Sequence, residues 1–448
     1  MKDTYLVAGC GISGIGAAKL LLNVDARVIL YDGNTALDPE GIKGKLGNRE
    51  GVTVVLGELT DEVAKQCKAC VISPGIPLTM PFVEVLRSSE IPIWSEIELA
   101  YRFSKGKLAA ITGTNGKTTT TALVGEILAA YFDSAFVVGN IGIPYTEKAL
   151  EMREDSVTVV EVSSFQLETI VDFHPTVSAI TNITPDHLNR HITMENYIAV
   201  KESVTKNQTP DEVCVLNYED IALRKFGESI DRKVIFFSSL QELPEGLFVR
   251  DGRIIFRHDG LDEDIVGTEE LNILGRHNHE NAMTAIAVGW AMGVPVAVIR
   301  EVLKRFMPVE HRIEFVTNKA GVAYYNDSKG TNPDAAIQAV KAMVKPTVLI
   351  AGGYDKGSDY DEWIATFGGK VKALVLLGQT ADKIETAARK AGFTNILRAG
   401  SMEEAVKLSA EAAVSGDAVL LSPACASWGM FNNYEERGRI FKDIVRAL

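Results

Sequence analysis

Two glycine-rich segments of this chain have the composition and spacing of phosphate-binding loops. The first, Gly9-Cys-Gly-Ile-Ser-Gly14, lies between an apolar run over residues 5–8 and a helical pattern over residues 15–22, and Asp32 follows at the distance of a ribose-binding carboxylate. Glycines in this context let backbone N–H groups approach a diphosphate at a helix N-terminus, whichever nucleotide carries it. Taken alone, the segment favours an NAD-dependent dehydrogenase.

The second segment, Gly113-Thr-Asn-Gly116-Lys117-Thr118, follows an apolar run over residues 108–112. Its amides can surround phosphates, Lys117 can reach the terminal ones, and Thr118 can ligate magnesium. The loop is a shortened form, because the general Gly-x4-Gly-Lys-Thr pattern requires glycine where this chain has Ile111. Hydride transfer has no use for a triphosphate site, so the two loops together favour a phosphate-driven reaction on a nucleotide-linked substrate.

A carboxylate and a lysine follow in the same part of the chain. Glu161 ends the apolar run 157–161, where P-loop proteins place the acidic partner of the metal ion. Lys201 lies in a segment of helical pattern that Thr193 would cap. Spacing alone gives Lys201 no role.

His187 and His191 are four residues apart, a spacing that suggests zinc on one face of a helix. Leu188 follows His187, however, where the His-Glu-x-x-His motif of zinc hydrolases requires glutamate. We therefore do not expect zinc hydrolysis.

The composition bounds the class of protein. The chain has 448 residues, 46% hydrophobic and 23% charged, which is typical of a globular protein with about three domains. Lysine and arginine number 46 against 59 aspartates and glutamates, a net charge of −13. Such a chain repels polyanions, so we expect no nucleic-acid partner, and a phosphate-bearing ligand must meet locally arranged positive charge.

Three other sequence features concern the cellular location of the protein and the chemistry of its cysteines. The uncharged stretch 281–299 nearly reaches membrane-spanning length, but Gly293-Val-Pro295 interrupts it, so we expect two core helices and no membrane insertion. Cys67-x-x-Cys70 has no second pair at zinc spacing, and we interpret it as two ordinary thiols. The run before the first glycines is too short for a signal-peptide core, so we expect a cytoplasmic protein.

Three blocks of alternating apolar and helical segments organise the chain, a pattern that predicts parallel sheets. The first block ends near Ser95, the second begins after the polar link 104–107, and the third follows Pro308. A β-leaning excursion over 236–266 is interpreted as hairpins or a mobile insertion. The other strands are expected at residues 5–8, 27–31, 108–112, 157–162, 177–181, 322–325, 347–350, 373–377 and 418–421.

These residues together resemble the Mur ligase family, the ATP-dependent enzymes that build the peptide stem of peptidoglycan precursors. The resemblance covers essentially the whole chain. Its motifs are Gly113-Thr-Asn-Gly-Lys-Thr-Thr-Thr, Gly139-Asn-Ile-Gly-x-Pro144, Glu161-Val-Ser-Ser-Phe-Gln-Leu, Thr184-Pro-Asp-His-Leu, Tyr197-x-x-x-Lys201, Gly275-x-His-Asn-x-x-Asn281 and His311-Arg312-x-Glu314.

The two ends of the chain are similar to those of the D-glutamate-adding branch of the family. At the N-terminal end the similarity lies in the first glycine-rich loop, Ser73-Pro-Gly-Ile76 and Ser95-Glu-Ile-Glu-Leu. Asn326-Asp-Ser-Lys-Gly-Thr331 and the segment from Leu421-Ser-Pro-Ala-Cys-Ala-Ser427 to Tyr434-Glu-Glu-Arg-Gly resemble its third domain. The Asp-Asn-Pro-Arg motif of the diaminopimelate-adding relative is absent from the sequence, which argues against the step that follows.

The resemblance implies an α/β fold in three domains. Residues 1–95 would form a Rossmann-like UDP-sugar-binding domain, 96–308 a P-loop ATPase-like ATP-binding domain, and 309–448 a Rossmann-like, doubly wound amino-acid-binding domain. The implied reaction adds D-glutamate to UDP-N-acetylmuramoyl-L-alanine through an acyl phosphate, giving ADP and phosphate. Its cofactors would be two Mg²⁺ ions, with ATP as co-substrate, and we expect a monomer.

The resemblance also assigns site residues. Lys117, Glu161, His187 and Lys201 would be catalytic. Lys201 would be carbamylated by CO₂ and would hold metal together with Thr118, Glu161 and His187. ATP would contact Gly113, Thr114, Asn115, Gly116, Lys117, Thr118, Thr119, Asn278, Asn281, Arg312 and Asp327. The UDP-sugar would contact Ile12, Ser13, Asp32, Gly75 and Asn140. D-Glutamate would contact Lys329, Thr331, Lys356, Ser427 and Tyr434.

Three alternatives share part of this pattern. A folylpolyglutamate synthase or another Mur ligase would keep the ATP centre, but the N-terminal Gly-x-Gly-x-x-Gly and the Ser-Pro-Ala-Cys-Ala-Ser run argue against both. A dehydrogenase would oxidise NAD(P)H without releasing ADP. A regulator that binds ATP without turnover would have no need of Glu161, His187 and Lys201 together.

Overall fold

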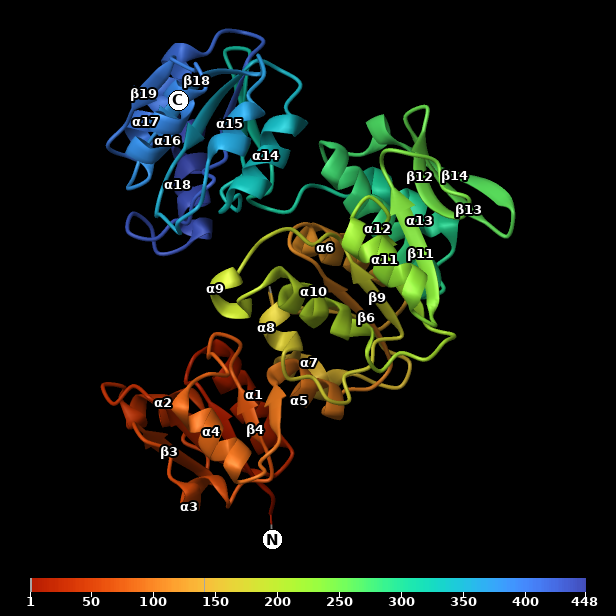
Figure 1. The fold of residues 1–448 in the computed structure, drawn as a ribbon, viewed down its shortest axis with the longest axis vertical. Helices are drawn as coiled ribbons and strands as arrows, with labels where there is room; N and C mark the ends of the chain where they lie inside the picture. Colours follow the sequence, from red (N-terminus) through yellow and green to blue (C-terminus); the bar gives the residue numbers. More distant parts are fainter. Residues whose placement is uncertain (1, 141) are drawn as a thin grey trace. The chain divides into compact units, whose positions relative to one another are not determined.

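A computed structural model of the chain describes residues 2–140 and 142–448 (Figure 1). Ile141, within the Gly139–Pro144 motif, lies outside the described residues. The chain divides into two compact units. One holds the chain up to Thr268 together with Glu280–Lys304, and the other holds Glu269–His279 with Arg305–Leu448.

The first sheet has five parallel strands in the order β3-β2-β1-β4-β5. Alternate residues of β1 contribute to two different cores, Val7 to one and Leu6 to the other, so both faces of the sheet are covered. The elements of this region are β1 (Thr4–Ala8), α1 (Ile12–Asn23), β2 (Arg27–Asp32), α2 (Pro39–Lys45), β3 (Val52–Leu56), α3 (Asp61–Ala64), β4 (Cys70–Ile72), α4 (Pro81–Ser88), β5 (Ile93–Ser95) and α5 (Glu96–Phe103).

The second sheet has nine strands in the order β14-β13-β12-β11-β10-β9-β6-β8-β7. Its strands are parallel except for the antiparallel pairs β12–β13 and β13–β14, which are the predicted hairpins. The elements are β6 (Lys107–Thr112), α6 (Lys117–Ala129), β7 (Ala135–Gly139), α7 (Tyr145–Lys148), β8 (Val157–Glu161), α8 (Ser164–Leu167), β9 (Val177–Ile180), α9 (Leu188–His191), α10 (Met194–Glu202), β10 (Val213–Asn217), α11 (Ile221–Ser229), β11 (Lys233–Ser238), β12 (Gly246–Arg250), β13 (Arg253–His258), β14 (Leu261–Gly267), α12 (Arg276–Ala291) and α13 (Val296–Arg305).

The third sheet has six strands in the order β15-β16-β20-β17-β18-β19, and only the edge pair β15–β16 is antiparallel among the described pairings. Leu349 packs into the core formed with α14 and α15, whereas Val348 and Ile350 pack into the core formed with α17 and α18. The sheet is therefore doubly wound. The elements are β15 (Glu314–Lys319), β16 (Val322–Asn326), α14 (Pro333–Ala342), β17 (Thr347–Ala351), α15 (Asp361–Ala365), β18 (Val371–Leu376), α16 (Ala381–Lys390), β19 (Ile396–Arg398), α17 (Met402–Ala412), β20 (Ala418–Leu421) and α18 (Tyr434–Ala447).

Several local predictions are confirmed. The uncharged stretch forms the two helices α12 and α13, with Gly293-Val-Pro295 between them. Among the helices of the described part of the chain, none combines the length and the hydrophobicity needed to cross a membrane. Thr193 caps α10 by accepting a hydrogen bond from the backbone N–H of Asn196. Cys67 and Cys70 are buried free thiols, as are the other three cysteines.

Candidate functional site

The P-loop joins β6 to α6 at the carboxyl edge of the second sheet. Gly113 has a φ of +138° and Gly116 a φ of +86°, and a Cβ at Gly113 would lie 2.0 Å from Oγ1 of Thr181. Glycine alone fits there. Nζ of Lys117 donates to the carbonyl oxygens of Gly113 (2.9 Å) and Thr114 (2.8 Å). This lysine therefore folds over the loop, beside a helix N-terminus that favours anions.

The segment after β9 holds the loop from its other side. The backbone N–H of Asn115 donates to Oδ1 of Asn182 (2.9 Å). Oγ1 of Thr114 accepts from the N–H of Thr184 (3.0 Å) and lies 3.0 Å from the hydroxyl of Tyr197. Asn182, Thr184 and Tyr197 were not among the predicted site residues, although the last two lie in the motifs that carry the resemblance. The loop geometry thus depends on residues far along the chain.

The first turn of α6 lies against α12. Thr118 and Thr119 are buried there, and Asn281 lies beside the loop, because a Cβ at Gly116 would be 2.3 Å from its Oδ1. Oγ1 of Thr120 donates to the same oxygen of Asn281 (3.3 Å). The structure therefore brings Asn281, one of the predicted ATP contacts, to the P-loop.

Glu161 ends β8 and is only 2% exposed. It pairs in register with Ile111 of β6, two residues before the P-loop begins. Nδ2 of Asn140 donates to Oε1 of Glu161 (3.0 Å), and the N–H of Asn140 donates to its carbonyl oxygen (2.8 Å). Asn140, predicted to contact the UDP-sugar, thus lies directly beside the predicted metal ligand.

Lys201 is buried to 1% exposure on α10, and its Nζ donates to the carbonyl oxygen of Gly113 (2.8 Å). Lys117 and Lys201 therefore share one carbonyl acceptor. Burial lowers the pKa of Lys201 well below its usual value, and the charge of Lys117 lowers it further, against the opposing effect of Asp186. The structure thus places a buried amine directly beside the P-loop.

His187 precedes α9 with a left-handed φ of +53°. Its ring lies edge-on to Phe165, with the centroids 4.9 Å apart, and its Nε2 is 3.4 Å from Oδ2 of Asp186. His191 is buried instead, with Nε2 3.0 Å from Oγ of Ser164. Both rings contact Phe165, but His191 is buried and His187 is more exposed.

The donor set fits magnesium. Thr118 and Glu161 offer a hydroxyl and a carboxylate, the oxygen ligands that Mg²⁺ prefers. His187 offers an imidazole nitrogen, and Lys201 offers an oxygen ligand only in its carbamylated form. Thr118 and Glu161 thus supply the kind of oxygen ligands that one Mg²⁺ requires.

The first glycine-rich loop joins β1 to α1. Gly9 has a φ of +100°, and a Cβ at Gly14 would lie 1.8 Å from the carbonyl oxygen of Gly9. Oδ2 of Asp32 accepts from the N–H of Cys10 (3.1 Å), which ties the end of β2 to the loop. Oγ of Ser73 is buried there without a hydrogen-bond partner among the described residues. Ser73 was not predicted as a contact, although its motif was quoted.

The other predicted UDP-sugar contacts lie at the surface. Ile12 is 79% exposed at the start of α1, Ser13 is half-buried next to it, and Gly75 is exposed after β4. β1 and β4 are neighbours at the point where the strand order reverses. Doubly wound sheets bind ligands at such a switch point.

In the second unit, Asp327 follows β16 and lies near the charge of Arg312, another predicted nucleotide contact. Asp327 is 3% exposed, and its Oδ2 accepts from Oγ of Ser422 (2.7 Å). Burial raises the pKa of Asp327 to about 7, against the hydrogen bond from Ser422 and the charge of Arg312. Nε of Arg312 is buried and has no hydrogen-bond partner in the described chain. Asn278 donates from Nδ2 to the carbonyl oxygen of Leu274 (2.7 Å).

The predicted D-glutamate contacts lie on loops at the carboxyl ends of β16, β17 and β20. Nζ of Lys329 is 5.3 Å from the ring centroid of Tyr434, and Nζ of Lys356 is 5.6 Å from that of Trp428. The N–H of Thr331 donates to the carbonyl oxygen of Lys329 (2.8 Å). Trp428 was not among the predicted site residues, although its position next to Ser427 in the sequence could have indicated it.

Arg437 is a further residue that the sequence reasoning missed. It is 2% exposed, and its guanidinium donates to Oγ (3.0 Å) and the carbonyl oxygen (2.7 Å) of Ser328 and to the carbonyl oxygen of Cys425 (3.1 Å). It therefore joins the loops after β16 and β20. The sequence feature that could have indicated Arg437 is the Tyr434-Glu-Glu-Arg segment, which contains it.

Comparisons with known proteins identify the family of the chain. Residues 3–95 match the Mur ligase MurD-like N-terminal domain, 111–289 the Mur ligase middle domain, and 311–425 the Mur ligase glutamate ligase domain. The chain is 55% identical over 443 residues to a UDP-N-acetylmuramoylalanine--D-glutamate ligase of Lachnoclostridium phytofermentans, covering 99% of this chain and 98% of that protein. It is 55% identical over 448 residues to the protein of the same name from Lachnospira eligens, covering 100% and 99%.

Solved structures share the fold. MurF from Acinetobacter baumannii aligns with a TM-score of 0.65 at 15% identity, covering 99% of this chain and 93% of that one. UDP-N-acetylmuramate-alanine ligase MurC from Thermotoga maritima aligns with a TM-score of 0.61 at 18% identity, covering all of both chains. At these identities the likeness supports the architecture only.

Proposed function

This chain belongs to the Mur ligase family, and from that premise we propose that it is the ATP-dependent ligase that joins D-glutamate to UDP-N-acetylmuramoyl-L-alanine in peptidoglycan precursor synthesis. The relatives that carry this activity in their name are 55% identical over essentially the whole chain. The observation in the structure that carries the proposal is the convergence of Lys117 and Lys201 on the carbonyl oxygen of Gly113. A dehydrogenase would have no use for this arrangement.

The reaction proceeds in two steps. A carboxylate oxygen of the alanyl group attacks the γ-phosphorus of ATP. The bond between the γ-phosphorus and the bridging oxygen of the β-phosphate breaks, ADP departs, and an acyl phosphate remains. The amine of D-glutamate then attacks the acyl carbon, phosphate departs, and the nitrogen loses a proton to form the amide. Both steps bring anions together, so the principal requirement is preorganised positive charge.

Lys117 and the P-loop amides supply that charge at the triphosphate. Thr118 and Glu161 would hold one Mg²⁺, and His187 and carbamylated Lys201 a second. Bound Mg²⁺ neutralises charge on the phosphates and on the reacting carboxylate. The buried amine of Lys201, in its neutral form, would attack CO₂ and lose a proton, which would place a carbamate anion beside the P-loop. Asn140 orients Glu161 through the 3.0 Å hydrogen bond to its Oε1.

The other substrates have sites of their own in this proposal. The UDP-sugar binds at the first loop, with Asp32, Ile12, Ser13, Gly75 and Asn140. D-Glutamate binds at the loops of the third sheet, with Lys329, Thr331, Lys356, Ser427 and Tyr434. Residues 1–95, 96–308 and 309–448 thus each receive one substrate. We place the enzyme in the cytoplasm and expect a monomer.

The test is phosphate release from ATP and Mg²⁺ with UDP-N-acetylmuramoyl-L-alanine. D-Glutamate is supplied, omitted, or replaced by L-glutamate or a diamino acid. Release that requires D-glutamate supports the proposal. Release that is indifferent to the amino acid refutes it, and NAD(P)H oxidation without ADP release would favour a dehydrogenase.

A further inference from the structure

The turn that carries Arg312 has an unusual backbone. His311 and Ile313, on either side of Arg312, have left-handed φ values of +66° and +46°. Ile313 is β-branched, and such a residue rarely adopts this conformation. Two left-handed residues within three positions persist only where the surroundings hold them in place.

One part of those surroundings is a set of hydrogen bonds on the turn itself. Nδ2 of Asn326 donates to Nδ1 of His311 (2.8 Å) and lies 3.1 Å from Oε2 of Glu314. The same oxygen of Glu314 accepts from the N–H of His311 (3.0 Å). The carbonyl oxygen of His311 accepts from the N–H of Lys329 (3.1 Å). Glu314 and Asn326 thus secure the first half of the turn.

The other part comes from α18, more than a hundred residues along the chain. Nζ of Lys442 donates to Oε1 of Glu310 (2.5 Å) and to Oε1 of Glu314 (3.0 Å), the residues on either side of the turn. Lys442 is 6% exposed. One helical turn earlier, a Cβ at Gly438 would lie 2.2 Å from Nδ1 of His311, so the helix packs directly against the imidazole.

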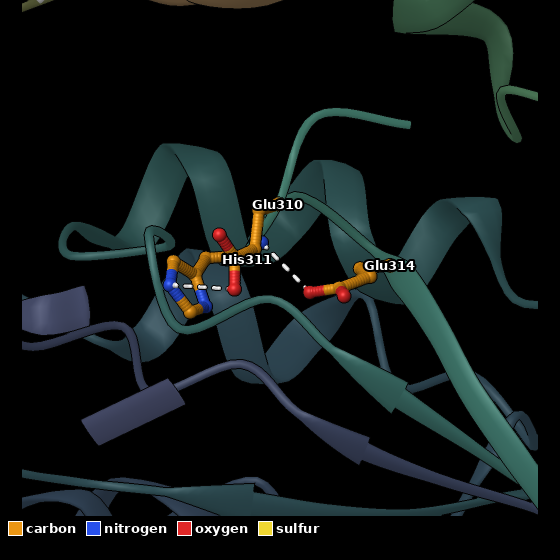
Figure 2. A group of neighbouring side chains, drawn as sticks. All are labelled: Glu310, His311 and Glu314. Atoms are coloured by element: carbon orange, nitrogen blue, oxygen red, sulfur yellow. Dashed lines mark hydrogen bonds and ion pairs between the residues drawn. The ribbon is translucent and has the colours of Figure 1, made fainter. Parts of the chain in front are cut away.

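Figure 2 shows Glu310, His311 and Glu314 gathered at the start of β15. One potential ligand atom from each lies within 4.8 Å of the other two, an arrangement that could hold a metal ion. The ammonium of Lys442 already lies against two of the three. It therefore supplies the positive charge that keeps two carboxylates close together.

We propose that Lys442 is a positioning residue, which clamps Glu310 to Glu314 and so holds the His311–Ile313 turn in the conformation that presents Arg312 to the nucleotide. The inference rests on the proposed function, in which Arg312 contacts ATP. The buried, unpartnered Nε of Arg312 is the group that this clamp makes available.

The test compares Lys442→Met with a matched control, a lysine of β15 whose side chain contacts the same helix. Lys319→Met removes a lysine whose Nζ donates to the carbonyl oxygens of Arg446 (2.8 Å) and Leu448 (3.2 Å), at the end of α18 and away from the turn. In Lys442→Met we expect KM for ATP to rise about tenfold, with KM for D-glutamate and for the UDP-sugar unchanged. Lys442→Arg, which keeps the charge, restores most of the loss, and Lys319→Met leaves all three constants at wild-type values.

Three results would overturn the proposal: an unchanged KM for ATP in folded Lys442→Met, an equal rise of all three constants, or the same effect in Lys319→Met. If Lys442→Met does not fold, Glu310→Gln weakens the same clamp from its exposed end and must raise KM for ATP selectively. Hydrogen exchange over residues 309–316 separates this proposal from the enzyme's function. Exchange there must accelerate in Lys442→Met and not in Lys319→Met, even if the wild-type protein shows no D-glutamate-dependent phosphate release.

Discussion

Replacing Asp327 with asparagine tests the electrostatics of the second unit. The Asp327 carboxyl is buried at the end of β16, and its Oδ2 accepts a hydrogen bond from Ser422. Burial raises the pKa of Asp327 to about 7, although the Ser422 hydrogen bond and the charges of Arg312 and Arg437 oppose the shift. Asp327→Asn keeps an acceptor oxygen for Ser422 and removes the titratable charge.

Proton linkage gives the direction in which the free energy of unfolding changes with pH. The unfolded carboxyl ionises near pH 3.9, so the folded state binds this proton more tightly, and Asp327 destabilises the fold progressively as the pH rises from about 4 to about 7. A shift of about 3 pKa units corresponds to a penalty of about 4 kcal/mol above pH 7. About 2 kcal/mol of it develops between about pH 5.5 and pH 7. The free energy of unfolding of Asp327→Asn, relative to wild type, should therefore rise by about 2 kcal/mol between about pH 5.5 and pH 8.5.

Urea titrations at the two pH values measure this difference. Pulsed hydrogen exchange, read by mass spectrometry on peptides from β16, β17 and β20, isolates the unfolding of this unit. Groups common to both proteins cancel in the comparison. A relative stability that stays constant between the two pH values, or that falls as the pH rises, would refute the reasoning.

Asp417→Asn in the same unit is the matched control. Burial would raise the pKa of Asp417, but the hydrogen bond from Nζ of Lys372 lowers it below its usual value. A carboxyl whose pKa is lowered by folding stabilises the fold at pH values above its unfolded pKa, and this stabilisation is lost only in acid. The difference between Asp417→Asn and wild type should therefore not change over this pH window.

Three further substitutions probe the rest of the molecule. Lys201→Arg keeps a permanent charge and cannot be carbamylated, so kcat should fall on the order of 10²–10³-fold, while the circular dichroism spectrum stays unchanged. Near-normal turnover of this variant would exclude a carbamate. Gly14→Ala places a Cβ 1.8 Å from the carbonyl oxygen of Gly9, so KM for the UDP-sugar should rise about tenfold or more. Calorimetry should find ATP binding unchanged, and weakened ATP binding would contradict a local effect. Glu98, fully buried, accepts from the N–H groups of residues 171–173 and from Arg102. Urea unfolding of Glu98→Gln should show a loss of about 3–5 kcal/mol, and a loss below about 1 kcal/mol would mean that the network is not coupled to folding.

The architecture was largely predictable from the sequence because its signals are local. Continuous apolar runs bounded by glycine mark strands that are buried on both faces, and β1, β6 and β20 lie within a residue of their predicted limits. The two loops are likewise determined locally, since each lies between a strand and a helix, and at Gly9 and Gly113 a side chain would collide with a neighbouring group. Side-chain roles assigned through the family, such as that of Asn140, went beyond what spacing alone could support.

By itself, then, the sequence determined which segments are strands, which loops can bind phosphate, and which family of enzymes the chain resembles. Only the tertiary structure decided what each buried polar group faces. Lys201 lies 88 residues from Gly113 in the chain and 2.8 Å from its carbonyl oxygen in the fold, and Lys442 reaches Glu310 across 132 residues. The physical reason is that burial and charge act through space. The low pKa of Lys201 and the high pKa of Asp327 arise from desolvation and from neighbours that only folding brings together.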